Sequence, residues 1–181
     1  MCVSKSDSFI LLNGFHSISL NDFFANYTFF GDGIFTLGLC AFLFLLKQKK
    51  LALLILVAFL SSGLTTQIIK YYIYAPRPRL FFESSNYHYY LSNYRNSYSG
   101  SNSFPSGHTT SAFALATVLA LHFNNKLFSI IIFIAAALVG YSRIYLAQHF
   151  LMDVFVGAFL GISFATISVV LMNSKLLKLP A

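Results

Sequence analysis

Five long apolar segments constrain this chain more than any other feature of its sequence. They cover residues 28–46, 51–69, 109–123, 127–146 and 150–172. Each is close to the ~20 residues that an α-helix needs to cross a bilayer, although the third reaches that length only by beginning in the preceding loop. Only 9% of the 181 residues are charged, against about 25% in a soluble domain. The sequence therefore predicts one all-α domain, 1–181, built as a bundle of five transmembrane helices.

The segment ahead of the first apolar run allows two interpretations. Its sequence SLNDFFANYTFF alternates aromatic with polar residues, which is typical of a helix lying in the headgroup region. We expect residues 1–27 to form such an interfacial segment, and the remnant of a sixth span is the alternative. Asp32 fits best at the outer edge of the first span.

The basic residues indicate how the helices are oriented. Six lysines fall on one side of a five-span bundle: Lys47, Lys49, Lys50, Lys126, Lys175 and Lys178. Because loops rich in Lys and Arg stay in the cytoplasm, that side is expected to be cytoplasmic. The loop 73–104 and the region 143–153 then lie outside. The net charge of +7 is explained by topology, and no basic run longer than KQKK suggests binding to nucleic acid.

The first polar motif is KYYIYAPRPR, residues 70–79, at the outer end of the second span. Pro76 and Pro78 end the helix and stiffen the chain around Arg77. This restraint suits an arginine that is held in place to bind a ligand, together with Lys70. The alternative is a basic aromatic belt whose long side chains reach the headgroups.

The second motif is SFPSGHTTSAFALA, residues 103–116. Pro105 and Gly107 indicate a turn, and Ser106 is a candidate helix cap. A turn that leads into a helix presents unpaired N–H groups and the positive end of the helix dipole, which together favour an anion. His108 lies there and is able to exchange a proton. The alternative is an ordinary capped helix start with an incidental histidine.

The third motif is SRIYLAQHFLMD, residues 142–153. His149 and Asp153 are four residues apart, so on one helix they would be in contact. A carboxylate beside an imidazole fixes its tautomer and makes the other nitrogen a better nucleophile or base. Arg143 precedes them. The alternative is a mutually satisfied polar cluster that joins two helices, although ionisable residues within a membrane are functional candidates by default.

The predicted topology brings the three motifs to one outer surface. The residues concerned are Lys70, Arg77, His108, Arg143, His149 and Asp153. Three cations without a local anion, two histidines and one aspartate favour a strongly negative ligand. Arginine offers a planar fork that matches phosphate oxygens, and lysine adds a point charge. The sequence therefore predicts a phosphate site.

The pattern K-x6-R-P, then P-S-G-H, then S-R-x5-H-x3-D resembles the type 2 phosphatidic acid phosphatase superfamily, which includes the vanadium haloperoxidases. The FFGDG before the first span is similar to the bacterial integral-membrane branch of that family. Many members have six spans, with a first helix that this chain lacks or has shortened. The resemblance implies an integral protein of the bacterial inner (plasma) membrane, with its site facing the periplasm or the cell exterior.

The resemblance also implies a role for each matching residue. His149 attacks phosphorus and forms a phosphohistidine, Asp153 orients it, and His108 protonates the leaving oxygen and later activates water. The phosphate oxygens are held by Lys70, Arg77, Arg143, Ser106 and Gly107. The resemblance implies a phosphatase that needs no metal and no cofactor.

The expected function is that of a metal-independent lipid phosphate phosphatase acting on a phosphomonoester or diphosphate. Undecaprenyl diphosphate, lipid A, phosphatidylglycerol phosphate and phosphatidic acid are the candidate substrates. Two alternatives stay open: a metallohydrolase with His108, His149 and Asp153 as ligands, and a non-enzymatic binder or transporter of lipid phosphates.

The Tyr/Ser/Asn-rich loop 82–104 is either a solvated loop or a lid that selects the headgroup through Glu83, His88 or Arg95. The sequence contains no indication of oligomeric state.

Overall fold

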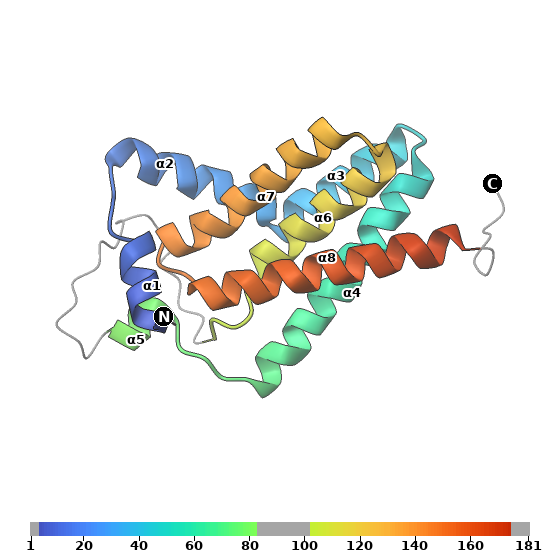
Figure 1. The fold of residues 1–181 in the computed structure, drawn as a ribbon. Helices are drawn as coiled ribbons and strands as arrows, with labels where there is room; N and C mark the ends of the chain where they lie inside the picture. The colour runs from blue at the N-terminus through green and yellow to red at the C-terminus, as the bar shows by residue number, and fades with distance from the viewer. Residues whose placement is uncertain (1–3, 83–101, 175–181) are drawn as a thin grey trace.

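The structure, a computed structural model, describes residues 4–82 and 102–174, and every regular element in these two ranges is helical (Figure 1). The elements in chain order are α1 (Lys5–Leu12), α2 (Ile18–Tyr27), the 3-10 turn η1 (Thr28–Gly31), α3 (Gly33–Leu45), α4 (Lys49–Tyr72), α5 (Pro78–Phe82), α6 (Gly107–Phe123), α7 (Lys126–Tyr145) and α8 (Leu151–Asn173). The predicted all-α class is confirmed for this part of the chain.

Three of the described helices are long and apolar enough to cross a membrane, namely α4, α7 and α8. A fourth span exists if α2 with η1 and α3, which bend by 54° at their junction, count as one broken span. Helix α6 begins two residues before the predicted segment, but its 17 residues are still short of the ~20 that span a bilayer. The number of five or six spans therefore stays a prediction.

The first predicted span, 28–46, is not one continuous helix. The chain forms the short turn η1 and then becomes extended at Asp32, whose φ is −73° and ψ 143°. The Oδ1 atom of Asp32 accepts a hydrogen bond from the N–H of Ile34 at 2.9 Å. Aspartate is a strong helix cap and a poor interior helix residue, so α3 begins here. Residues 1–27 contain α1 and α2, and their placement in the headgroup region stays a prediction.

Helix α6 lies at the centre of the bundle, in contact with α4, α7 and α8. It meets α8 at two glycines four residues apart, Gly157 and Gly161. A Cβ atom at Gly157 would lie 2.6 Å from the Ser106 carbonyl oxygen, and one at Gly161 would lie 2.5 Å from that of Thr110. Only glycine permits this approach, as at other closely packed membrane helices. The contact presses the start of α8 against the turn that precedes α6.

One end of the bundle is covered by α1 and α5 (Figure 1). Phe9 of α1 is fully buried, with ring centroids 5.4 Å from Phe82 of α5 and 5.5 Å from Phe150. The side-chain amide of Asn13 donates to the carbonyls of Ile144 and Tyr145, at 2.8 and 2.9 Å. These carbonyls lie in the last turn of α7, and that of Ile144 also accepts the N–H of Ala147 at 2.9 Å. The N-terminal segment thus stabilises the corner where α7 meets α8.

The lysine-rich turns lie at the opposite end. Figure 1 shows the α3–α4 and α6–α7 connections away from α1 and α5. Lys47 belongs to the first connection, Lys49 begins α4 directly after it, and Lys126 begins α7 after the second. This arrangement agrees with the expected shared side, and the identity of that side stays a prediction. Lys175, Lys178 and the loop residues Glu83, His88 and Arg95 lie outside the described residues.

Candidate active site

His149 and Asp153 are in contact at the corner between α7 and α8, which is the connection 146–150 with the first turn of α8. Their Nδ1 and Oδ2 atoms are 3.6 Å apart, and the two residues are 3% and 2% exposed. The sequence suggested a pair within one helix, but His149 precedes the first residue of α8. The contact forms because the Asp153 carboxylate turns back to accept the N–H of Phe150 at 2.9 Å, as a helix cap does.

Ser103 completes this pair. Its hydroxyl donates a hydrogen bond to Oδ2 of Asp153 and lies 3.3 Å from Nδ1 of His149. The N–H of Ser103 donates to the carbonyl of Ala75 at 2.7 Å, so the serine is held from both sides and is fully buried. We did not single out Ser103 from the sequence, because a serine beside a turn is ordinary and no spacing distinguishes it.

The turn before α6 is joined directly to the corner. The N–H of Ser106 donates to the carbonyl of Asp153 at 2.9 Å. The Ser106 hydroxyl accepts from the N–H of Thr109 at 3.4 Å, so the predicted cap is present. Ser106 is fully buried, whereas Gly107 and His108 are partly exposed. These two residues occupy the first helical positions, where N–H groups have no partner within a helix and attract anions.

Two arginines approach the corner from different segments. Arg143 in α7 is 8% exposed, and its Nη1 donates to the Thr28 hydroxyl at 2.7 Å. Arg77, which follows α4, donates to the side chain of Gln148. The Nε atoms of both arginines are buried without a hydrogen-bond partner among residues 4–82 and 102–174. Each guanidinium is therefore anchored at one end and retains donor capacity for a further group.

Lys70, in the last turn of α4, is positioned by Asn102. Its Nζ donates to the Asn102 carbonyl at 3.4 Å, and the Asn102 side chain donates to the Lys70 carbonyl at 2.5 Å and to that of Ile73 at 2.7 Å. Asn102 thereby satisfies the carbonyls at the C-terminus of α4. The sequence provided no signal for this role, because an isolated Asn in a polar loop is common.

The structure brings the predicted residues together at one end of the bundle. His108 interacts electrostatically with Arg143, His149 and Arg77, and Lys70 does so with Arg77 and Asp153. Burial lowers the pKa of His149 to about 4, although the neighbouring Asp153 carboxylate opposes the shift. His149 is therefore neutral at pH 7, which is the form able to act as a nucleophile.

No three His, Cys, Asp or Glu side chains lie close enough to hold a metal ion in the described ranges. His108, His149 and Asp153 are thus not arranged as one ligand set. The expected independence from metals and cofactors stays a prediction.

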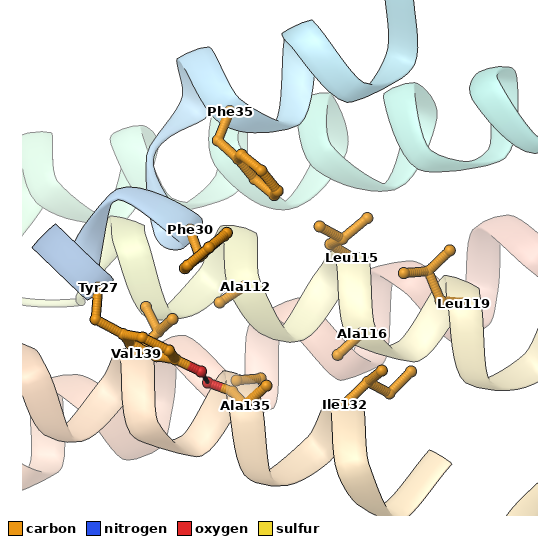
Figure 2. Close-up of a pocket in the computed structure, with 11 residues that line it drawn as sticks. Tyr27, Phe30, Phe35, Ala112, Leu115, Ala116, Leu119, Ile132, Ala135 and Val139 are labelled. Atoms are coloured by element: carbon orange, nitrogen blue, oxygen red, sulfur yellow. Dashed lines mark hydrogen bonds between the residues drawn. The ribbon is translucent and has the colours of Figure 1, made fainter. Parts of the chain in front are cut away.

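An apolar slot runs along α6 beside this site (Figure 2). It has a volume of about 310 Å³ and lies between η1, α3, α6 and α7, with lining residues that include Tyr27, Phe30, Ala112, Ala116, Ala136 and Val139. A Cβ atom at Gly31 would be 2.6 Å from the Val139 side chain and 2.7 Å from the His108 carbonyl oxygen. Gly31 therefore packs between Val139, which lines the slot, and the backbone of His108.

These features define a class: a helical membrane protein with a buried His–Asp pair facing basic side chains and a helix N-terminus. The profile of the PAP2 superfamily matches residues 51–176. The chain belongs to the PAP2 superfamily, as its three motifs predict, and is an integral membrane protein.

Its relatives include a lipid A 4'-phosphatase of Porphyromonas gingivalis, 33% identical over 163 residues. The match covers 85% of this chain and 66% of that protein, so the chain spans just under two thirds of its length. Two solved structures are similar, each with a TM-score of 0.74. Aquifex aeolicus LpxE is 34% identical, with 89% of this chain and 92% of that one covered. A PAP2 type phosphatidylglycerolphosphate phosphatase from Bacillus subtilis is 25% identical, with 94% and 86% covered.

Proposed function

We propose that this protein is a lipid phosphate phosphatase that works through a phosphohistidine on His149. It hydrolyses a phosphomonoester or a diphosphate carried by a membrane lipid, and releases inorganic phosphate. Lys70, Arg77, Arg143 and the N–H groups at Gly107 and His108 bind the phosphate oxygens. Ser106 contributes by fixing the turn, because its own hydroxyl and N–H already have partners.

The observation that best supports a phosphate ligand is the pair of unpartnered guanidinium Nε atoms of Arg77 and Arg143. A buried donor without a partner costs about 1–3 kcal/mol, and both arginines keep such a donor among the described residues. Phosphate oxygens satisfy guanidinium donors in charge-assisted hydrogen bonds. The positive charge of Lys70 and of a helix N-terminus favours the same ligand.

The contacts of His149 support a different task for each of its two ring nitrogens. Nδ1 faces Asp153 and Ser103, so Nε2 is the nitrogen that attacks phosphorus. An N–P bond forms while the P–O bond to the lipid breaks, and His108 gives a proton to the departing oxygen. Water then attacks phosphorus with His108 as the base, and the N–P bond breaks. The cations offset the charge that develops on the phosphoryl oxygens.

The apolar slot supports a lipid as the bearer of the phosphate. Its lining is hydrocarbon apart from Tyr27, whose hydroxyl donates to the carbonyl of Ala135 at 3.1 Å. Gly31 packs between Val139 of the slot lining and the backbone of His108. A hydrocarbon chain of the substrate therefore fits the slot while its phosphate occupies the site. The relatives named for lipid A and phosphatidylglycerolphosphate make these two lipids the first candidates, ahead of undecaprenyl diphosphate and phosphatidic acid.

Phosphate release from purified lipid phosphates tests the proposal. Wild-type protein in detergent is expected to release phosphate from at least one of the four lipids, with inhibition by vanadate and full activity in excess chelator. The His149→Ala variant is expected to bind lipid without turnover. Wild-type rates in this variant would refute the phosphohistidine route. Binding without turnover by the wild type would favour the non-enzymatic alternative, and loss of activity in chelator would favour a metallohydrolase.

We further propose that the site faces the periplasm or the cell exterior of a bacterial inner membrane. The shared end of Lys47, Lys49 and Lys126 supports this orientation. A reporter enzyme fused after Lys178 is expected to be active in the cytoplasm. An active periplasmic reporter at that position would reverse the orientation.

A further inference from the structure

The turn η1 with Asp32 reaches the candidate site, although it lies outside the segment matched by the family profile, which begins at residue 51. It comprises Thr28 and the first four residues of the FFGDG sequence at positions 29–33. Two of its polar side chains contact residues to which the proposed function gives roles. Thr28 accepts a hydrogen bond from Arg143, and Oδ2 of Asp32 lies 3.8 Å from Nε2 of His108.

The turn is held tightly against both helices that bear these residues. A Cβ atom at Gly31 would lie 2.7 Å from the carbonyl oxygen and 3.0 Å from the Cβ of His108, and 2.6 Å from the Val139 side chain. Gly31 thus permits a contact that any other residue would prevent. On the other side, the Tyr27 hydroxyl donates to the carbonyl of Ala135 in α7. Asp32 and Thr28 are therefore fixed relative to His108 and Arg143.

The two carboxylate oxygens of Asp32 have separate partners. Oδ1 caps α3 through the N–H of Ile34, which sets the rotation of the side chain. Oδ2 is thereby directed toward His108. The side chains of His108 and Asp32 are 31% and 38% exposed, so both remain accessible at the mouth of the site. A distance of 3.8 Å is longer than a hydrogen bond, and catalytic contacts of this kind often shorten only when substrate is bound.

We propose that Asp32 and Thr28 are positioning residues, Asp32 for the proton-transferring His108 and Thr28 for the phosphate-binding Arg143. This inference rests on the proposed function. Protonated His108 faces Arg143 from α7, Arg77 from the segment after α4, and His149 from the α7–α8 corner. All of these are cations or neutral groups, and among residues 4–82 and 102–174 the carboxylate paired with His108 is Asp32, from the η1–α3 junction. Asp32 stabilises the imidazolium that donates its proton to the leaving oxygen when the P–O bond breaks.

Thr28 acts on binding instead of on proton transfer. Its hydroxyl satisfies Nη1 of Arg143 at 2.7 Å in a buried position. The guanidinium is thereby held in one orientation with its Nε left for the ligand. Without the hydroxyl, Arg143 has a second unsatisfied donor and a less defined position.

Asp32→Asn removes the charge and keeps the helix cap, because Asn caps as well as Asp. We expect kcat/KM for a long-chain alkyl phosphate to fall at least about tenfold, since loss of general acid catalysis costs 10²–10⁴-fold when complete. The alkaline limb of its pH profile is expected to move about one pH unit lower, because an opposite charge at this distance favours the charged histidine. p-Nitrophenyl phosphate, whose leaving group needs no protonation, should lose less than threefold. Asp22→Asn, an exposed aspartate of α2, is the matched control.

Thr28→Val keeps the shape and removes the hydroxyl. We expect the inhibition constants of vanadate and inorganic phosphate to rise about tenfold, as for loss of a hydrogen bond to a charged group, with an unchanged pH profile. Thr28→Ser should restore them. Helix content and thermal midpoint by circular dichroism verify folding of every variant.

The outcomes distinguish failure of the proposed function from failure of the roles given to Asp32 and Thr28. If wild-type protein releases phosphate from none of these compounds, the proposed function fails. If wild-type protein is active but Asp32→Asn keeps its pH profile and loses both substrates equally, Asp32 has only a structural role and the inference is wrong. Wild-type inhibition constants in Thr28→Val would overturn the role of Thr28.

Discussion

The N–H of Ser106 donates a hydrogen bond to the carbonyl of Asp153 at 2.9 Å. This single main-chain contact joins the turn before α6 to the first turn of α8. It holds the helix start that bears His108 against the corner that bears His149. The contact is possible because Gly157 and Gly161 let α8 approach α6.

Close packing of α6 and α8 is expected to be intolerant of larger side chains. Gly161→Val would push a side chain into the Thr110 carbonyl, 2.5 Å from the position of the first added carbon. We expect destabilisation by about 1–3 kcal/mol, as for other overpacked contacts, measured as a lower thermal midpoint in detergent. Gly63→Ala in α4 has open space around it and should be neutral or slightly stabilising. Equal midpoints for the two variants would contradict the proposed packing constraint.

Asp153→Asn tests whether the carboxylate orients His149 for attack on phosphorus. The amide retains an acceptor for the N–H of Phe150 but removes the charge that holds the His149 tautomer. We expect kcat to fall about 10²–10⁴-fold with little change in KM, by analogy with other carboxylate–histidine pairs. Steady-state phosphate release measures both parameters. A loss below threefold would show that Asp153 is dispensable for orienting His149.

Ser103→Ala is expected to lower kcat by about 10–100-fold, because a hydrogen bond to a charged group contributes about 1.5–3 kcal/mol. The serine fixes the Asp153 carboxylate and touches His149, so the loss should appear in kcat more than in KM. Ser129→Ala is the matched control, since the Ser129 hydroxyl donates to the local carbonyl of Asn125, at the end of α7 far from the site. Unchanged kcat in Ser103→Ala would refute this role.

His149 is expected to titrate at a lower pH than an ordinary histidine. Burial lowers its pKa to about 4, from about 6.5 in the unfolded chain. The unfolded state therefore binds a proton in this interval that the folded state does not. The free energy of unfolding should decrease as the pH falls from about 6.5 to 4, and recover as it rises. Histidine ¹⁵N NMR, assigned with His149→Gln, measures the midpoint directly, and a midpoint near 6.5 would contradict the burial effect.

Narrowing the apolar slot should discriminate between substrates by chain length. Ala136 is a buried lining residue, whereas its neighbour Ala137 is exposed on α7. Ala136→Leu is expected to raise KM for a long-chain lipid phosphate about tenfold, since each excluded CH₂ loses about 0.8 kcal/mol. Its activity on p-nitrophenyl phosphate should stay unchanged, which also reports an intact fold. Ala137→Leu should leave both activities unaltered. Equal effects of the two variants would argue against a chain in the slot.

The sequence by itself determined the helical class and the family. Apolar runs near 20 residues allow little else than membrane helices, since no other local structure satisfies its backbone in lipid. The motifs around Lys70, His108 and His149 predicted a shared site because helices of fixed length return the chain to the same end of a bundle. The sequence placed Asp32 correctly at the edge of an apolar helix, but it did not show that residues 28–31 form the separate turn η1 before α3 begins.

Only the tertiary structure decided which residues support the site. Ser103, Thr28, Asn102 and the Oδ2 atom of Asp32 reach it through contacts with residues far away in the chain. No periodicity or spacing in the sequence predicts such contacts, because they depend on how α6, α7 and α8 pack. Serine, threonine and asparagine are also common in turns and caps, so the presence of these residue types did not indicate a role in the site. These few polar side chains lie beside His149, Arg143 and Lys70 because of how the backbone packs in three dimensions.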